Sequence, residues 1–260
     1  MADLIVRREG ATGFIVFSNP PKRNALTYDM WKRVPEAVAQ LERDGDVRII
    51  VVRGDGDTAF AAGADISEFD RMRDSIGATA SYNEAVDDAN ASLFICSKPT
   101  LASIRGPCIG GGLEIAAHCD VRFCADDAIF SLPAARLGMG YAYASIVRIE
   151  QLIGPAYCAE MVFCGLRYSA QEALHMRLVN RVVPVAELDR VVAEYCTTVT
   201  DNAPLTVAAM KRALVESYKD RTERDMRTVR TMIDNCFSSD DYREGRRAYK
   251  EKRKPVFRGR

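Results

Sequence analysis

Three consecutive glycines, Gly110, Gly111 and Gly112, are followed two residues later by the carboxylic acid Glu114. An apolar run precedes them and helix-forming residues follow, so the pattern predicts a strand, a tight turn and a helix. Amides at a helix start have no partners and lie at the positive end of the helix dipole. They suit an anion, or an oxygen that becomes negative during a reaction, with Glu114 within reach as an acid or base. The alternative is that the glycines serve close packing and the glutamate only favours the dipole.

A second turn of small residues has the same form. Residues 61–64 read Ala-Ala-Gly-Ala and come soon after a predicted strand at residues 47–53. A ligand could approach this backbone closely, and Asp65 or Ser67 could cap the helix that follows. One amide from each turn would form an oxyanion hole, in which a single donor is typically worth about 3–4 kcal/mol of transition-state stabilisation. An ordinary tight loop with a helix cap is the alternative.

Other motifs fit the chain less well. The glycine spacing from Gly106 onward is neither a dinucleotide fingerprint nor a phosphate loop, and there is no Gly-x-Ser-x-Gly nucleophile elbow. Cys108 and Cys119 flank the glycines and are interpreted as packing residues. His118 follows Glu114 by four residues on the same helix face and could tune it, although a packed histidine is the favoured interpretation.

The composition narrows the classes of protein. The 36 basic and 36 acidic residues cancel, so we expect neither a nucleic-acid partner nor a membrane partner. The eight cysteines form no Cys-x-x-Cys pair and only two histidines occur, which indicates free thiols in a reducing cytosol and no metal site. The sequence shows no signal-peptide core and no apolar run of membrane-spanning length, so a cytoplasmic location is expected.

The order of predicted elements indicates the fold class. A hairpin is predicted at residues 4–17 and a helix at residues 27–43, in which Pro35 should cause a kink or delay the start. Strands and helices then alternate as far as Pro184, with a helix predicted at residues 82–96 among them. Only helices follow Pro184, and one of them is predicted at residues 222–237. This order predicts an α/β core with a helical C-terminal part.

Four sequence blocks resemble the enoyl-CoA hydratase/isomerase, or crotonase, family. They are Asn-Pro-x-x-x-Asn-Ala-Leu at residues 19–26, Ala-Phe-Ala-Ala-Gly-Ala-Asp-Ile at residues 59–66, the glycine and glutamate block at residues 106–120, and the ending at residues 240–257. The resemblance implies a spiral of strand-strand-helix (ββα) units. It further implies a core with the active site in residues 1–200 and a C-terminal α-helical trimerisation region in residues 201–260, in a homotrimer or a dimer of trimers.

The resemblance also implies roles for individual residues. The substrate would be an acyl-CoA thioester, so coenzyme A is part of the substrate and no further cofactor is expected. The amides of Ala64 and Gly111 would hold the thioester oxygen and stabilise an enolate, with Glu114 as a catalytic residue. The residues implied in coenzyme A binding are Lys22 or Arg23 at the phosphates, Ala62, Ala64, Asp65, Ile66 and Gly110 along its path, and Tyr249 and Lys252 from a neighbouring subunit. A solvated surface is the alternative for the basic tail.

The chain departs from the family pattern at Ala134, which stands where the family's hydratases carry a second glutamate. The Pro-Gly-x-Gly-Gly that usually follows is also absent, and residues 139–143 read Met-Gly-Tyr-Ala-Tyr. Hydration needs a positioned water and a proton for the α-carbon, and losing one acid–base group typically costs about 10²–10⁴-fold. Glu114 alone could do both slowly, or Tyr141 could replace the missing donor.

Several reactions therefore stay open. Enoyl-CoA hydratase-like lyase chemistry, with a place in fatty acid metabolism, is the first prediction by resemblance. Decarboxylation of a malonyl-type CoA ester using Tyr141 is the second, because it needs only the enolate pocket and a weak donor. Isomerisation is less favoured, because the family's isomerases usually keep the base that is missing here. A protein that binds acyl-CoA with little turnover is the last alternative, and Tyr141 and Tyr143 could equally be walls of an acyl pocket.

Overall fold

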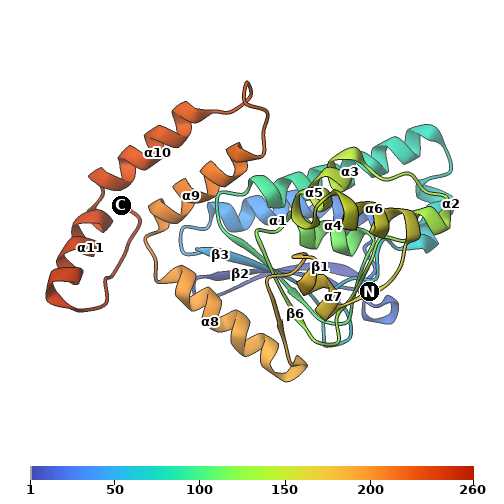
Figure 1. Cartoon of the computed structure of the whole chain (residues 1–260), viewed down its shortest axis with the longest axis horizontal. Coiled ribbons are helices and arrows are strands. Elements are labelled where there is room, and N and C mark those ends of the chain that lie inside the picture. The colour runs from blue at the N-terminus through green and yellow to red at the C-terminus, as the bar shows by residue number, and fades with distance from the viewer. Residues whose placement is uncertain (1) are drawn as a thin grey trace.

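The computed structural model describes residues 2–260 and has a six-stranded sheet at its centre (Figure 1). Its strand order is β1-β2-β3-β4-β6-β9. Strands β1 and β2 are antiparallel, and all the remaining neighbours in this sheet are parallel. A smaller sheet has the order β5-β7-β8. The strands are β1 Asp3–Glu9, β2 Thr12–Ser18, β3 Ile49–Gly54, β4 Thr100–Ile104, β5 Pro107–Ile109, β6 Val121–Ala125, β7 Ile129–Ser131, β8 Tyr168–Ser169 and β9 Arg181–Val183.

Helices lie on both sides of the large sheet, and α9, α10 and α11 extend away from it at one end (Figure 1). The α-helices are α1 Tyr28–Arg43, α2 Phe69–Met72, α3 Ile76–Ile95, α4 Gly111–His118, α5 Tyr143–Ile153, α6 Pro155–Cys164, α7 Ala170–His175, α8 Leu188–Thr200, α9 Pro204–Ser217, α10 Met226–Ser238 and α11 Asp240–Glu251. Short 3-10 helices are η1 Pro20–Lys22, η2 Ile66–Glu68, η3 Ala134–Leu137 and η4 Val185–Glu187. The α/β prediction is confirmed, whereas a boundary at residue 200 and trimerisation through the last helices stay predictions.

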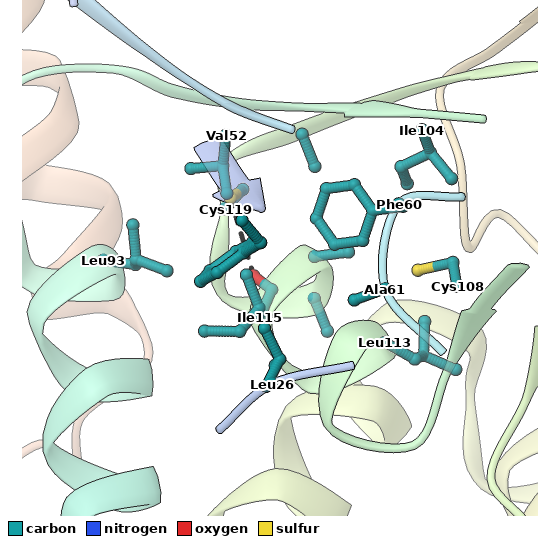
Figure 2. Close-up of a cluster of buried hydrophobic side chains, with 14 of the residues drawn as sticks. Leu26, Val52, Phe60, Ala61, Leu93, Ile104, Cys108, Leu113, Ile115 and Cys119 are labelled. Carbon is teal, nitrogen blue, oxygen red and sulfur yellow. Dashed lines mark hydrogen bonds between the residues drawn. The ribbon is translucent and has the colours of Figure 1, made fainter. Parts of the chain in front are cut away.

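The buried strand β3 shows how the sheet divides the core. Successive strand residues face opposite sides of a sheet. Ile50 and Val52 accordingly join the large cluster under α1, α3 and α4, whereas Ile49 and Val51 join a smaller cluster against α8. The large cluster also contains Phe60, together with Leu113 and Ile115 of α4 (Figure 2). The predicted active-site helix therefore rests on a fully buried apolar layer.

Several predicted element boundaries were wrong, and local caps account for two of them. The first helix starts at Tyr28 and continues through Pro35 to Arg43, so the proline did not delay its start. Helix α3 starts at Ile76 rather than near residue 82, because the Ser75 hydroxyl accepts a hydrogen bond from the Ala78 amide at 3.2 Å. Helix α10 starts after Asp225, which caps it in the same way. The short strands β5 and β8 were not predicted.

In residues 2–260, no helix combines the length and the apolar character that crossing a bilayer would require.

Candidate active site

The turn before α4 needs glycine at each of its three positions, for different reasons. Gly110 has φ 53° and ψ −121°, a conformation that L side chains rarely adopt. A Cβ atom on Gly111 would lie 2.6 Å from Cζ2 of Trp31, and one on Gly112 would lie 2.5 Å from the carbonyl oxygen of Ala61. The glycines therefore do serve close packing, as the alternative interpretation held. The same packing places the first amides of α4 beside the second small-residue turn.

That second turn reaches the same place. The Cβ position on Gly111 is 3.8 Å from the amide nitrogen of Ala64, so the two predicted oxyanion residues are neighbours. A short parallel bridge orients the turn, because the Leu26 amide donates to the Gly63 carbonyl at 2.8 Å and the Asp65 amide donates to the Leu26 carbonyl at 2.8 Å. Successive residues of extended backbone point in opposite directions. The Ala64 amide is therefore directed away from Leu26.

The amides of Ala64 and Gly111 have no hydrogen-bond acceptor within the described part of the chain, residues 2–260. Gly111 is the first residue of α4, where an amide has no partner inside the helix. Both residues are only partly buried, so a ligand oxygen can reach them. Two unpaired donors on adjacent turns are the arrangement that an oxyanion hole requires.

Glu114 lies in the first turn of α4 and is 6% exposed. The side-chain amide of Asn90, on α3, donates a hydrogen bond to its carboxyl group, with Nδ2 3.4 Å from Oε2. Burial raises the pKa of Glu114 from 4.5 to about 7, although the nearby Tyr141 hydroxyl and the hydrogen bond from Asn90 act in the opposite direction. A carboxyl group with this pKa is present in both protonation states near neutral pH, which suits general acid–base chemistry.

Tyr141 faces Glu114 from the loop between η3 and α5. Its hydroxyl group lies 3.7 Å from the Cβ position of Gly110, at the start of α4. Burial and the nearby carboxylate raise the pKa of Tyr141 well above 10, so the phenol stays protonated and acts as a donor. Tyr143, which was a second candidate for the pocket wall, is 84% exposed.

No other carboxyl group comes from this loop. Residues 128–149 contain neither aspartate nor glutamate, and Ala134 begins the short helix η3. The loop is held near the glycine turn because the Gly110 amide donates to the Ser131 carbonyl at 2.9 Å. Glu114 and Tyr141 are therefore the proton-carrying groups that α4 and this loop bring together.

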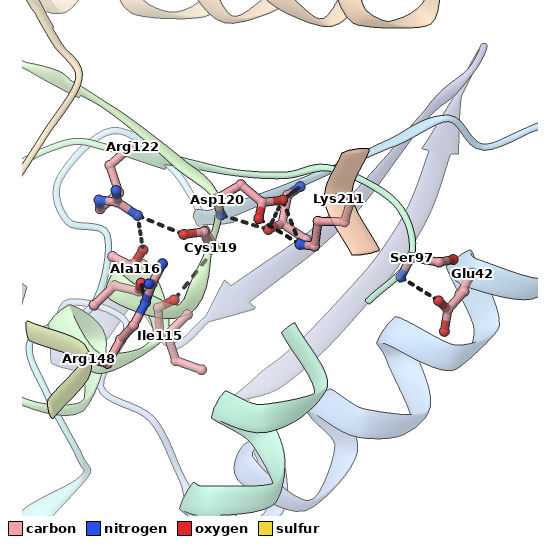
Figure 3. A network of polar contacts seen from close by, with 11 residues as sticks. Glu42, Ser97, Ile115, Ala116, Cys119, Asp120, Arg122, Arg148 and Lys211 are labelled. Atoms are coloured by element: carbon pink, nitrogen blue, oxygen red, sulfur yellow. Dashed lines mark hydrogen bonds and ion pairs between the residues drawn. The ribbon is translucent and has the colours of Figure 1, made fainter. Parts of the chain in front are cut away.

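A buried network fixes the far end of α4 (Figure 3). Arg122 donates to the carbonyl oxygen of Cys119 at 2.7 Å and to that of Ala116 at 3.4 Å, and Arg148 donates to that of Ala117 at 2.8 Å. These cations satisfy the last carbonyls of the helix and complement its dipole. The network thereby fixes the direction in which the first amides of α4 point.

The contacts of His118 are with the main chain of α4 and with Phe94. Its Nδ1 atom lies 2.8 Å from the main-chain carbonyl oxygen of Glu114, and its ring packs edge-on against Phe94. Burial lowers the pKa of His118 from 6.5 to about 4, so the ring is neutral. Cys108 and Cys119 are fully buried, and burial raises the pKa of the Cys119 thiol to about 12, so both are packing residues as expected.

The predicted coenzyme A residues near the second turn do lie close to one another. The Lys22 ammonium group is 2.7 Å from the Asp65 carboxylate and 2.6 Å from the Ser67 hydroxyl. Asp65 also caps η2, which confirms one of the two predicted caps. The Ala62 amide donates to the carbonyl oxygen of Arg23 at 3.0 Å. The side chains of Arg23 and Ile66 are exposed, and their contact with coenzyme A stays a prediction.

Tyr249 and Lys252 lie far from this turn in a single chain. Tyr249 is 87% exposed on α11, and Lys252 follows that helix with φ 51°. Figure 1 places α11 at the opposite end of the molecule from α2. Their predicted contact with coenzyme A therefore requires a neighbouring subunit, and it stays a prediction.

Two residues near the site were not predicted from the sequence. Asn90 is a buried polar residue on the helix face that also carries Val86 and Leu93. A polar residue in an otherwise apolar face was the one sequence feature that could have indicated a role for Asn90. Arg73 lies beside Tyr82, with its Cζ atom 4.1 Å from the ring centroid. Nothing in the spacing around Arg73 distinguishes it from a surface arginine.

Known proteins share this fold and sequence. The family model described as enoyl-CoA hydratase/isomerase matches residues 7–260. The chain is 29% identical to the short-chain-enoyl-CoA hydratase of Clostridium acetobutylicum over 252 residues, covering 97% of this chain and 96% of that protein. It is 32% identical to the carnitinyl-CoA dehydratase of Salmonella typhi over 244 residues, covering 92% of each.

A solved structure agrees with these relatives. The enoyl-CoA hydratase/carnithine racemase from Magnetospirillum magneticum superposes with a TM-score of 0.91 at 34% identity, covering 100% of this chain and 97% of that one. These similarities define the class as α/β enzymes of the crotonase fold. The chain belongs to the enoyl-CoA hydratase/isomerase family. An acyl-CoA thioester substrate is consistent with that family.

Proposed function

We propose that this enzyme hydrates 2-enoyl-CoA thioesters or dehydrates 3-hydroxyacyl-CoA thioesters, with Glu114 as its one carboxylic acid–base group. The observation that carries the proposal is a buried carboxyl group with a pKa of about 7, in the first turn of a helix whose first amide and the neighbouring Ala64 amide are unpaired. The hydratase and dehydratase names of the relatives support this choice of reaction.

The reaction needs one proton to move twice. The thioester oxygen accepts hydrogen bonds from the amides of Ala64 and Gly111. The Glu114 carboxylate takes a proton from water as the water oxygen bonds to the β-carbon, and the double-bond electrons move onto the thioester oxygen as an enolate. Protonated Glu114 then delivers that proton to the α-carbon, and the thioester is restored. Tyr141 stays protonated near this carboxyl group and is available as a further donor.

Loss of the enoyl-thioester absorbance of crotonyl-CoA tests the proposal. We expect turnover by the wild-type enzyme and a fall in kcat of about 10²–10⁴-fold in Glu114→Gln, because the amide can neither take nor give the proton. Glu84→Gln, on the exposed face of α3, is the matched control. No absorbance change at high enzyme concentration, or full activity in Glu114→Gln, would contradict the proposal.

A second candidate is decarboxylation of a malonyl-type CoA ester, and the protonated Tyr141 phenol near Glu114 favours it. The bond between the α-carbon and the carboxylate breaks, carbon dioxide leaves, and the electron pair forms the same enolate. Tyr141 or Glu114 then protonates the α-carbon. Carbon dioxide release from methylmalonyl-CoA, lost in Tyr141→Phe and kept in the exposed control Tyr143→Phe, would support this candidate. Acyl-CoA binding with neither reaction would favour a protein that only binds acyl-CoA.

A further inference from the structure

A cavity of about 710 Å³ opens beside the Glu114 and Tyr141 pair. Three segments line it: α2 with the residues that follow it, the first turns of α3 and the loop that carries Tyr141. The lining residues are Phe69, Asp70, Arg73, Asp74, Thr79, Asn83, Met139, Gly140, Tyr141 and Ala142. Since Tyr141 belongs both to this wall and to the candidate active site, the cavity is placed to receive the part of an acyl group beyond the reacting carbons.

The guanidinium group of Arg73 is held in the wall of this cavity. Its Cζ atom lies 4.1 Å from the centroid of the Tyr82 ring and 4.9 Å from that of Phe69. Tyr82 is fully buried in the core, so one side of the guanidinium group rests on a rigid surface. The Thr79 hydroxyl lies 3.5 Å from the main-chain carbonyl oxygen of Arg73, and the Arg73 amide donates to the Phe69 carbonyl at 2.8 Å.

Arg73 has a buried donor without an acceptor. Within residues 2–260 its Nε atom has no hydrogen-bond partner and its guanidinium group forms no ion pair. Asp70 and Asp74 lie at the exposed rim, and neither pairs with it. Arg105 is a useful comparison, because the Nε atom of that buried arginine also has no partner among the described residues, yet its guanidinium group forms ion pairs with Asp57 and Asp189 at 3.0 Å.

The positive charge of Arg73 also acts toward the reacting groups. It lowers the pKa of both Glu114 and Tyr141, although burial dominates in each case and raises those pKa values. Because Arg73 and Tyr141 line the same cavity, an acyl group that enters the cavity past Tyr141 would meet the guanidinium group.

We propose that Arg73 binds a carboxylate at the far end of the acyl group, so that the preferred substrates are CoA thioesters of dicarboxylic acids. A guanidinium group binds a carboxylate through two parallel hydrogen bonds, and the aromatic contacts restrict its movement beforehand. Asn83 supplies a further donor on the same wall. The assignment rests on the proposed function only in that the thioester lies at Ala64 and Gly111.

Binding of three unreactive saturated thioesters tests this assignment. Calorimetric titrations would compare glutaryl-CoA, which ends in a carboxylate, with neutral pentanoyl-CoA and with cationic 4-(trimethylammonio)butanoyl-CoA. We expect the wild-type enzyme to bind glutaryl-CoA at least about tenfold more tightly than pentanoyl-CoA, as a charge-assisted contact allows. Arg73→Met should remove this preference, and Arg73→Lys should keep part of it.

Arg71→Met is the control, because Arg71 is exposed two residues before Arg73 and contacts Glu68 rather than the cavity. Its preference for glutaryl-CoA should equal that of the wild type. Equal affinities for the three thioesters, tighter binding of the cationic one, or an unchanged preference in a folded Arg73→Met or Arg73→Lys variant would each overturn the assignment. Thermal unfolding reports whether each variant is folded.

The result is separable from that of the proposed reaction. A preference for glutaryl-CoA that depends on Arg73, in an enzyme that hydrates no enoyl-CoA, would support the assignment and contradict the reaction. Hydration of crotonyl-CoA without any charge preference would support the reaction and overturn the assignment.

Discussion

The indole ring of Trp31 occupies the space that a side chain at Gly111 would need, with Cζ2 only 2.6 Å from the Cβ position. Trp31 is 1% exposed and belongs to the large apolar cluster, so it has little freedom to move. One contact thus joins the packing of α1 to the position of the first amide of α4. The absence of a side chain at Gly111 therefore serves both the packing against Trp31 and the position of the Gly111 amide.

Gly111→Ala should therefore damage the site. We expect a loss of about 1–3 kcal/mol in the free energy of unfolding, because the added methyl group overpacks the core. The displaced amide should lower kcat for crotonyl-CoA by about 10²–10³-fold, as is typical when one oxyanion donor is lost. Chemical denaturation and steady-state kinetics measure the two effects. Gly45→Ala, where nothing lies within 4 Å of the Cβ position, should be neutral in both.

The raised pKa of Glu114 should make stability depend on pH. Its value is about 7 in the folded protein and 4.5 in the absence of burial, so the folded protein binds more protons between these values. The free energy of unfolding should therefore rise as the pH falls from 8 toward 5, by up to about 3 kcal/mol from this group.

Glu114→Gln should remove this part of the pH dependence and stabilise the protein at pH 8, because it has no charge to bury. Urea denaturation at pH 5.5 and pH 8 measures the difference, with exposed Glu84→Gln as the control. A Glu114→Gln variant that is less stable than the wild type at pH 8 would contradict this prediction. It would show that the neighbours of Glu114 stabilise the ionised carboxylate more than burial destabilises it.

The hydrogen bond from Asn90 favours the ionised form of Glu114, since it lowers the pKa of that group. Asn90→Ala should therefore raise the pKa of Glu114 further. The pH–rate profile for hydration should shift to higher pH by about 0.5–1 pH unit, which corresponds to the free energy of one ordinary hydrogen bond. Asn235→Ala, on the exposed face of α10, should leave the profile in place. A purely packing role of Asn90 would lower stability without moving the profile.

Arg122→Met should destabilise the protein by about 2–4 kcal/mol, because it leaves the buried carbonyl oxygens of Ala116 and Cys119, at the end of α4, without this donor. Equilibrium unfolding measures this loss. Arg43→Met, an exposed change at the end of α1, should shift the free energy of unfolding by less than about 0.5 kcal/mol. Equal effects of the two changes would show that Arg122 does not hold the end of α4.

The sequence predicted the local parts of the site well. The small-residue turns at residues 61–64 and 110–112, the helix after the second of them and the nearness of Glu114 all depend on residues close together in the chain. Glycine and alanine indicate such turns directly. The free amide of Ala64, in contrast, depends on the bridge between residues 63–65 and Leu26.

Contacts between distant segments were the part that the sequence did not predict. Asn90 meets Glu114 across 24 residues of chain, and the position of Arg73 depends on the stacking of Tyr82 and Phe69 around it. The start of α3 was also missed, because the cap at Ser75 precedes a stretch without strong apolar periodicity. These features follow from tertiary packing, which local propensity does not specify.

A crystal structure of the enzyme with a bound saturated acyl-CoA would test the account most directly. We predict that the thioester oxygen lies about 2.7–3.1 Å from the amide nitrogens of both Ala64 and Gly111, with the α-carbon facing the Glu114 carboxyl group. A thioester bound with its oxygen away from either amide, or with its α-carbon out of reach of Glu114, would contradict the account.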